Sequence, residues 1–342
     1  MKQINFAIIG FGRIGKRFKQ KITENKNAKL MAICDVKKAS LDKLSKKYFI
    51  TDRYQDILKR KDVEVVYVAT PNSSHAQIAL AALKANKHVI CEKPMALTVL
   101  DANKMILASQ KSKGTLFIVK QNRFNPPVEK VKKLIDANKL GQIYLVTVNC
   151  FWNRNPDYYL HSDWKGKKNL DGGTLYTQFS HFIDIVYYLL GDFTEVFAQG
   201  KNFNHQKTIE FEDSGIVSFK LSNGALGSLN YSTAVYDSNM EGSITIIAEK
   251  GSIKIGGEYL NTLAFFKVKG QRKPRLNKGA KANDYGSYKG SMSNHDKVLN
   301  NVINTLQGKE TVSTSGFEGM KTIQIIESIY DSMQMGQAVK IK

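Results

Sequence analysis

A glycine-rich turn near the N-terminus constrains the fold of this chain more than any other feature. Residues 4–9 (INFAII) are a continuous apolar run, and GFGRIG follows at 10–15. A short apolar run that ends in a turn predicts a buried parallel strand, and the pattern after the turn predicts a helix over 13–25. In G-x-G-x-x-G, the first glycine permits a tight turn, the second lets the backbone approach a pyrophosphate, and the third lets helix and strand pack closely.

An acidic residue completes this pattern. Asp35 ends the next predicted strand, 29–36, twenty positions after Gly15. A carboxylate there accepts hydrogen bonds from adenosine ribose hydroxyls and repels a 2′-phosphate, which favours NAD over NADP, although Arg13 and Lys37 would weaken that preference. The alternative is a glycine turn beside a surface aspartate. The cofactor contacts expected from this region are Gly10, Phe11, Gly12, Arg13, Ile14, Gly15 and Asp35.

Strands and helices alternate up to about residue 122. The further predicted elements are a helix over 40–49 with Ser40 as its N-cap, strands at 63–70, 87–93 and 115–122, and helices at 75–86 and 98–113. This alternation predicts an α/β fold with a doubly wound parallel sheet.

The pattern changes after residue 122. Helices are predicted within 125–141, over 172–192, 293–307 and 316–333, with a strand at 142–153 and several strand-like runs that include an Asn223-Gly224 hairpin turn. Successive strands with flanking helices predict an α+β domain with a mostly antiparallel sheet. A length of 342 residues fits two domains, which we place at 1–122 and 123–342.

The charge balance is strongly basic, with 51 Lys and Arg against 30 Asp and Glu, a formal net charge of +21. Three interpretations are a lysine-rich solvated surface, attraction of an anionic substrate, and a nucleic-acid partner. The lysines are dispersed, and no nucleic-acid-binding motif is present, so we expect no nucleic-acid partner. The densest later stretch, 267–290, is predicted to be a long loop.

Three cysteines, Cys34, Cys91 and Cys150, are far apart and form no C-x-x-C pair. They indicate neither a zinc site nor a redox dithiol, so we expect no metal and a reducing cytoplasm. The first residues do not resemble a signal peptide, and no apolar run approaches the roughly 20 residues of a membrane helix.

The segment CEKPMAL (91–97) follows a predicted strand at the carboxyl edge of the sheet, where open α/β folds bind ligands. Its charges could also form a loop salt bridge between Glu92 and Lys93. Together with GFGRIG, ATPNSSH, QNRF and GGTLYTQFSHFID, it resembles the glucose–fructose oxidoreductase and inositol dehydrogenase (Gfo/Idh/MocA) family over essentially the whole chain. The resemblance implies an NAD-dependent dehydrogenase in which Lys93 polarises or deprotonates the hydroxyl that is oxidised.

The resemblance also implies a role for His181, which would bind the reacting hydroxyl and serve as general acid or base. A buried structural histidine is the alternative. Many family members carry an Asp where this chain has Thr177, followed here by Gln178, which puts inositol dehydrogenase activity in doubt. Further cofactor contacts implied by the family are Thr70, Pro71, Asn72, His75, Glu92, Lys93, Gln121, Asn122 and Trp164, the last with a surface anchor as its alternative.

Further segments, including QNRFNPPV, FWNRNPDYY, DWKG and NHDKVLNNVI, resemble the UDP-N-acetylglucosaminuronate 3-dehydrogenase branch. That implies oxidation of a sugar carrying a diphosphate and a carboxylate, in surface polysaccharide (lipopolysaccharide O-antigen) synthesis, with 2-oxoglutarate as a possible re-oxidant and a homodimer or homotetramer as the assembly. The expected substrate contacts are Lys93, Arg123, Asn153, Arg154, Tyr159, Thr177, Gln178 and His181; Arg123, Asn153, Arg154 and Tyr159 are equally compatible with an interface role. A dehydrogenase of a free sugar or polyol and a non-catalytic NAD-binding regulator remain alternatives.

Overall fold

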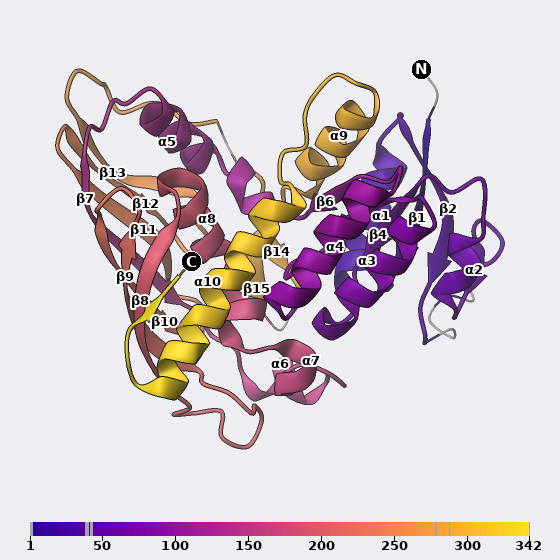
Figure 1. Cartoon of the computed structure of the whole chain (residues 1–342), viewed down its shortest axis with the longest axis horizontal. Helices are drawn as coiled ribbons and strands as arrows, with labels where there is room; N and C mark the ends of the chain where they lie inside the picture. Colours follow the sequence, from indigo (N-terminus) through magenta and orange to yellow (C-terminus); the bar gives the residue numbers. More distant parts are fainter. Residues whose placement is uncertain (1–2, 38–40, 42–43, 278, 287, 342) are drawn as a thin grey trace. The chain divides into compact units, whose positions relative to one another are not determined.

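The computed structural model describes residues 3–37, 41, 44–277, 279–286 and 288–341 (Figure 1). The chain forms two compact units. Unit 1 comprises Met1–Lys120 and His295–Ile323, and unit 2 comprises Gln121–Asn294 and Gln324–Lys342.

A six-stranded parallel sheet forms the core of unit 1, in the order β3-β2-β1-β4-β5-β6. Its apolar strands are buried on both faces, as a parallel sheet covered by helices requires. The predicted doubly wound sheet is confirmed. The strands are β1 (Ile4–Ile9), β2 (Ala28–Cys34), β3 (Phe49–Thr51), β4 (Val65–Val68), β5 (His88–Cys91) and β6 (Leu116–Ile118).

The helices of unit 1 pack on this sheet through apolar residues at helical spacing. Helix α1 buries Gly15, Phe18 and Ile22, and α4 is capped at its N-terminus by Thr98, whose hydroxyl accepts a hydrogen bond from the Asp101 amide. The helices are α1 (Arg13–Glu24), α2 (Tyr54–Leu58), the 3₁₀ turn η3 (Asn72–Ser74), α3 (His75–Lys84), α4 (Val99–Lys111), α9 (His295–Leu306) and the first part of α10 (Gly316–Met335).

The predicted helix over 40–49 is wrong in the part that the structure describes. Residues 44–48 form tight turns, and Phe49–Thr51 instead form strand β3, which pairs in parallel with β2. Edge pairing satisfies backbone groups of this segment that a short helix would otherwise satisfy, and helical propensity is too weak to decide between the two. Ser40, the expected N-cap, lies outside the described residues.

Residues His295–Ile323 group with unit 1, whereas the sequence placed all of 123–342 in one domain. The Thr314 carbonyl accepts a hydrogen bond from the Ile118 amide of β6, and the Asn25 amide group donates to Asn300 of α9. These contacts join segments that are 196 and 275 residues apart in the sequence, separations over which sequence periodicity carries no information.

An eight-stranded sheet forms the core of unit 2, in the order β13-β12-β11-β7-β10-β9-β8-β16. Only the β7–β10 pair is parallel, so the predicted mostly antiparallel sheet is confirmed. The turn at Asn223-Gly224 joins β9 to β10, with Gly224 at φ +86°. The strands are β7 (Ile143–Phe151), β8 (Phe193–Lys201), β9 (Ser214–Leu221), β10 (Leu226–Ser232), β11 (Glu241–Ala248), β12 (Gly251–Gly256), β13 (Thr262–Val268) and β16 (Val339–Lys340).

The stretch 267–290 is not one long loop. Strand β13 extends to Val268, and β14 (Ala282–Asp284) pairs with β15 (Lys289–Met292) in a small two-stranded sheet. The pairing satisfies backbone groups of a segment whose basic composition alone suggested a loop.

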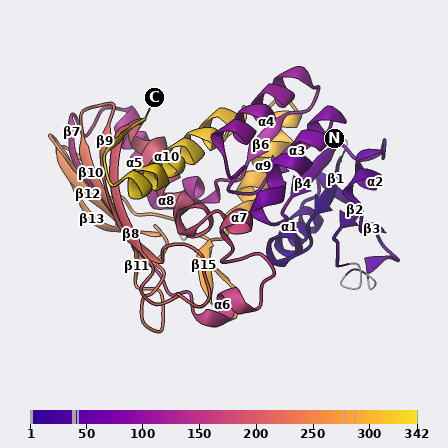
Figure 2. The same cartoon turned by 60° about the horizontal axis from the view of Figure 1, so that its bottom comes forward.

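Helices α5 and α8 lie on one face of the large sheet (Figures 1 and 2), and no helix of the described residues covers its other face. The predicted long helix over 172–192 is divided: it begins as a π-helix, η5 (Leu175–Phe179), and continues as α8 (Ser180–Leu190). The remaining helices of unit 2 are η4 (Gln121–Phe124), α5 (Pro126–Asp136), α6 (Pro156–Leu160), α7 (Lys168–Asp171) and the second part of α10.

Candidate active site

The three glycines of the N-terminal turn differ in what surrounds them. A Cβ on Gly10, at φ +93°, would lie 2.5 Å from the Ala69 carbonyl carbon, and one on Gly15 would lie 2.1 Å from the Gly10 oxygen. A Cβ on Gly12, the N-cap of α1, would meet nothing within 4 Å. Packing therefore requires the first and third glycines, while the second leaves open space before the helix amides, where a pyrophosphate can approach. This geometry fits NAD.

Asp35 lies beside this turn. Its Oδ2 accepts a hydrogen bond from the Phe11 amide at 2.6 Å, and its Oδ1 accepts one from the Lys37 amide at 2.8 Å. An ionised carboxylate has about four acceptor positions. Asp35 can therefore hold the turn in place and still accept hydrogen bonds from ribose hydroxyls.

His75 links two loops at the carboxyl edge of the sheet in unit 1. Its Nδ1 lies 2.7 Å from the Pro94 oxygen, and its Nε2 lies 2.9 Å from the Thr70 oxygen. Burial lowers the pKa of His75, outweighing the two backbone hydrogen bonds. Because both ring nitrogens face backbone carbonyls, the geometry fits a residue that positions the loops following β4 and β5, not a catalytic base.

The side chain of Glu92 lies in a buried cluster with Tyr67 and His295. Its Oε1 accepts a hydrogen bond from the Tyr67 hydroxyl at 2.5 Å and lies 3.4 Å from His295 Nε2, while its Oε2 accepts the Lys93 amide at 3.2 Å. Burial, the largest influence, raises the pKa of Glu92, but His295, Tyr67 and Lys93 together bring it below its ordinary value. Neither Tyr67 nor His295 was predicted as a site residue, although His295 lies in the distinctive NHDKVLNN segment.

His181 of α8 is buried and positioned by η4. Its Nε2 lies 3.2 Å from Nε2 of Gln121, which also donates to the Ser291 hydroxyl at 3.0 Å. With the Gln121 amide nitrogen as donor, His181 Nε2 is the acceptor. Two residues predicted for cofactor and substrate are therefore in direct contact within unit 2.

Asn122 follows Gln121 and has both side-chain polar atoms buried without a hydrogen-bond partner in the described part of the chain. Leaving a buried polar group unsatisfied costs about 1–3 kcal/mol, so such groups call for an explanation. The role of Asn122 as a cofactor contact stays a prediction.

Arg123 has a carboxylate partner. Its guanidinium donates two hydrogen bonds to Asp184, at 2.9 and 2.8 Å, and stacks over the Tyr188 ring at 4.5 Å. Both members of this pair are buried. The arrangement fits an anchor between η4 and α8 better than the substrate contact expected from the sequence.

Arg154 is also buried, with 2 % of its surface exposed, but the hydrogen-bond partners of its guanidinium in the described part of the chain are all neutral. Nε donates to Gln178 at 2.7 Å, and Nη1 donates to the Asn153 oxygen at 2.6 Å and to Asn239 at 3.3 Å. Its remaining neighbours are the rings of Trp152, Tyr158 and Tyr288, 4.9–5.4 Å away. Aromatic faces offset part of the desolvation of a cation, but no carboxylate contacts this guanidinium among the described residues.

The other predicted substrate residues surround Arg154 or the π-helix. Gln178 donates to the Tyr158 hydroxyl at 2.8 Å, and the Thr177 hydroxyl donates to the Asp171 carboxylate. Thus an acidic group does lie next to the position where many relatives have Asp, but it comes from α7.

Three further residues occupy the same unit. Tyr159 packs edge-on against the His205 ring, and Asn153 donates to the Val235 oxygen at 2.6 Å. Half-buried Trp164 precedes Lys165, whose Nζ lies 3.6 Å from the centre of the Tyr158 ring. Lys165 therefore adds a second cation to the aromatic cluster around Arg154.

The family models agree with this architecture. The model for the NAD-binding Rossmann fold of the oxidoreductase family matches residues 4–120, and the model for its C-terminal alpha/beta domain matches residues 132–341. This chain belongs to the Gfo/Idh/MocA oxidoreductase family. It is accordingly an NAD-dependent oxidoreductase.

Among solved structures, this family member is similar to the WlbA dehydrogenase from Bordetella pertussis in complex with NADH and UDP-GlcNAcA. The two are 32 % identical with a TM-score of 0.90, covering 100 % of this chain and 99 % of the other. The WlbA dehydrogenase from Chromobacterium violaceum, in the same type of complex, is 31 % identical with a TM-score of 0.89, covering 100 % and 97 %. Myo-inositol 2-dehydrogenase from Thermotoga maritima is 24 % identical over 99 % of each chain.

None of the helices in the described ranges is long and apolar enough to cross a membrane.

Proposed function

We propose that this enzyme oxidises the 3-hydroxyl of UDP-N-acetylglucosaminuronic acid, in the synthesis of a surface polysaccharide sugar. The observation that carries the proposal is the buried guanidinium of Arg154, whose hydrogen-bond partners among the described residues are all neutral. The similarity to two enzymes solved with UDP-GlcNAcA supports the same substrate.

The charge of Arg154 favours an anionic sugar over a neutral one. Two unit charges about 6 Å apart interact by about 3 kcal/mol at an effective dielectric constant of about 20, which is roughly a hundredfold in affinity. Because the donors of Arg154 are largely engaged, we expect its field, not a direct contact, to attract the substrate. We propose half-buried Lys165 as the cation that contacts the substrate. A free polyol would leave the charge of Arg154 uncompensated.

The proposed chemistry divides between binding residues and two reactive side chains. NAD⁺, when bound, supplies the acceptor for the hydride that leaves C3. The glycine turn, Asp35 and Asn122 hold the dinucleotide, as do the residues of the loop after β4. Lys93 takes the proton from the 3-hydroxyl, and His181, fixed by Gln121, holds the same oxygen. Binding both partners in one orientation is the main contribution that the protein makes to the rate.

The first experiment incubates the purified protein with NAD⁺ and UDP-N-acetylglucosaminuronic acid, with and without 2-oxoglutarate. NADH absorbance and the keto-sugar product are both measured. We expect product formation, and a requirement for 2-oxoglutarate would show that the cofactor is re-oxidised while bound. The matched control substrate is UDP-N-acetylglucosamine, which lacks the carboxylate.

Absence of the keto-sugar product would rule out the proposed substrate without ruling out the cofactor. If NAD binds but no keto-sugar forms, this substrate is wrong, and free sugars and polyols are screened next. Equal turnover of the acid and of UDP-N-acetylglucosamine would refute the argument from Arg154, even if the reaction itself were found.

We further propose a homo-oligomer assembled through the uncovered face of the large sheet. Leu226, Leu145 and Ile247 lie side by side on β10, β7 and β11 and are 54 %, 45 % and 37 % exposed. Exposed apolar residues that are contiguous across strands mark interaction surfaces. Sedimentation should show a dimer or tetramer that Leu145→Asp dissociates. A monomeric wild type would refute the proposal.

A further inference from the structure

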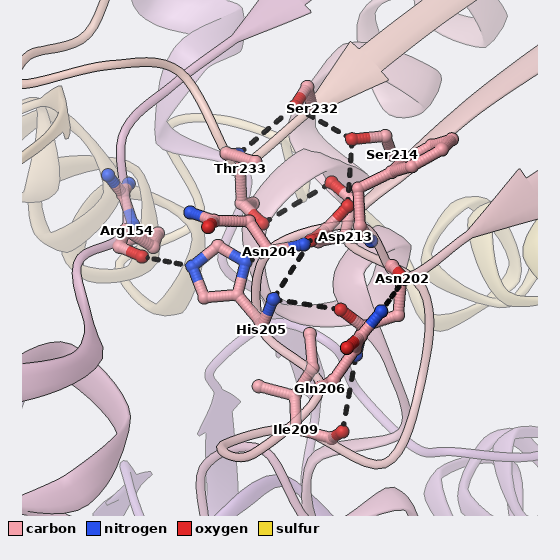
Figure 3. Close-up of polar contacts among 12 residues, drawn as sticks. Arg154, Asn202, Asn204, His205, Gln206, Ile209, Asp213, Ser214, Ser232 and Thr233 are labelled. Atoms are coloured by element: carbon pink, nitrogen blue, oxygen red, sulfur yellow. Dashed lines mark hydrogen bonds and ion pairs between the residues drawn. The ribbon is translucent and has the colours of Figure 1, made fainter.

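A buried pair, His205 and Asp213, lies in the segment between β8 and β9. The Asp213 Oδ2 lies 3.0 Å from His205 Nδ1 and accepts the amides of Phe203, Asn204 and His205 (Figure 3). The Ser214 hydroxyl donates to Oδ1 at 2.9 Å. Burial alone would raise the pKa of Asp213, but these donors hold it at about 2.

The other ring nitrogen of His205 reaches the main chain of Arg154. Nε2 lies 2.6 Å from the Arg154 carbonyl oxygen (Figure 3). A backbone carbonyl can only accept hydrogen bonds, and the same is true of the ionised carboxylate of Asp213. The two ring nitrogens of His205 therefore face acceptors on both sides, the Asp213 side chain and the main chain of Arg154.

The contacts continue from Arg154 to the π-helix η5, which directly precedes the helix that carries His181. The Arg154 amide donates to the Thr233 oxygen at 2.9 Å, so both sides of its backbone are fixed. Its guanidinium then donates to Gln178, three residues before His181. Contacts at the main chain and at the guanidinium of Arg154 thus connect Asp213, through His205, to the π-helix within unit 2.

We infer that the His205–Asp213 pair positions Arg154 for the anionic substrate. The pair fixes the backbone at residue 154, which places the guanidinium on Gln178 and its charge at the substrate side of the site. Neither member of the pair contacts the reacting atoms, so both are positioning residues. This inference rests on the proposed function, since it assigns the charge of Arg154 to recognition of the sugar acid.

The test measures binding without turnover. UDP-N-acetylglucosaminuronic acid is titrated calorimetrically into the full-length, NADH-loaded protein. His205→Ala removes the donor to Arg154, and we expect about tenfold weaker binding of the sugar with NADH affinity unchanged. His205→Gln retains an amide donor and should restore most of the affinity. Exposed His161, with 78 % of its side chain accessible, provides the matched control His161→Ala.

A double-mutant cycle separates positioning from general damage. If the pair acts through Arg154, His205→Ala should have little further effect in the Arg154→Met background. Asp213→Asn, which retains the shape of the side chain and removes the charge, should weaken binding about threefold and serves as the second variant if His205→Ala does not fold.

The outcomes distinguish the two proposals. If wild type binds the sugar acid and Arg154→Met weakens it, but His205→Ala and Asp213→Asn do not, the positioning inference is overturned and the proposed function stands. Additive effects in the double-mutant cycle also overturn it. If wild type does not bind the sugar acid at all, the proposed function fails, and the recognition role of the pair fails with it.

Discussion

A buried carboxyl group should make the stability of this enzyme depend on pH near neutrality. Glu212 precedes β9, and its Oε1 accepts hydrogen bonds from the hydroxyls of Tyr231 and Tyr330, at 3.0 and 2.9 Å. Burial raises the pKa of Glu212 to about 7 from its ordinary value of 4.5, and the two hydroxyls offset only part of that. The folded protein therefore binds this proton more tightly than the unfolded chain does.

The direction and size of this pH dependence follow from the difference in the pKa of Glu212 between the folded and unfolded states. A carboxyl whose pKa is raised by folding contributes stability that is fully present below pH 4.5 and is lost as pH rises through about 7. At about 1.4 kcal/mol per pH unit, the interval from 4.5 to about 7 corresponds to about 3 kcal/mol. The wild type should lose this amount between mildly acidic and mildly alkaline solution, before other titrating groups are counted.

Glu212→Gln is the perturbation that isolates the effect. The carboxamide oxygen can still accept both tyrosine hydroxyls, but it carries no charge at any pH. Relative to wild type, the free energy of unfolding should be nearly unchanged at about pH 4.5 and higher by about 3 kcal/mol at about pH 8.5. Denaturant unfolding followed by circular dichroism at both pH values measures this difference. Glu210→Gln makes the same substitution at an exposed site and serves as the control.

The result that refutes this reasoning is equally specific. If Glu212→Gln changes stability by the same amount at both pH values, or destabilises the protein at about pH 8.5, the carboxylate is not penalised by burial as the structure requires.

Three further substitutions test the cofactor and catalytic assignments. Lys93→Met should reduce the rate of sugar oxidation by about 10²–10⁴-fold. The affinity for NADH, measured by fluorescence titration, should be retained. Near-normal turnover would remove Lys93 from the mechanism. Asp35→Ser should weaken NAD⁺ binding about tenfold and improve the relative affinity for NADP⁺, since it removes the repelling charge; an unchanged preference would contradict this role. Gly15→Ala should lower the melting temperature or prevent folding, because its Cβ would lie 2.1 Å from the Gly10 oxygen, and wild-type stability would contradict that close packing.

Sequence reasoning worked where the constraint was local. The apolar run before Gly10 gave strand β1, and the helix after the turn ends within one residue of its expected position. The expected Asn223-Gly224 turn joins two paired strands. It failed over 40–49, where pairing with β2 decided the conformation, and within 172–192, where the first turn is π-helical.

The candidate site shows the same division. Gly10, Gly15 and Asp35 were predictable because turn sterics and strand order act over short stretches of chain. The different surroundings of Arg123 and Arg154 were not, because a guanidinium paired with a carboxylate and one with neutral partners look alike in sequence.

The sequence by itself determined the dinucleotide turn, the class of each sheet and the family, since these follow from local sterics, periodicity and motif spacing. Only the tertiary structure decided that His295 lies beside Glu92 and that Asp213 holds His205 on Arg154. Such contacts depend on which distant segments pack together, and packing is set by the burial and hydrogen bonding of the whole unit, not by the identity of neighbouring residues.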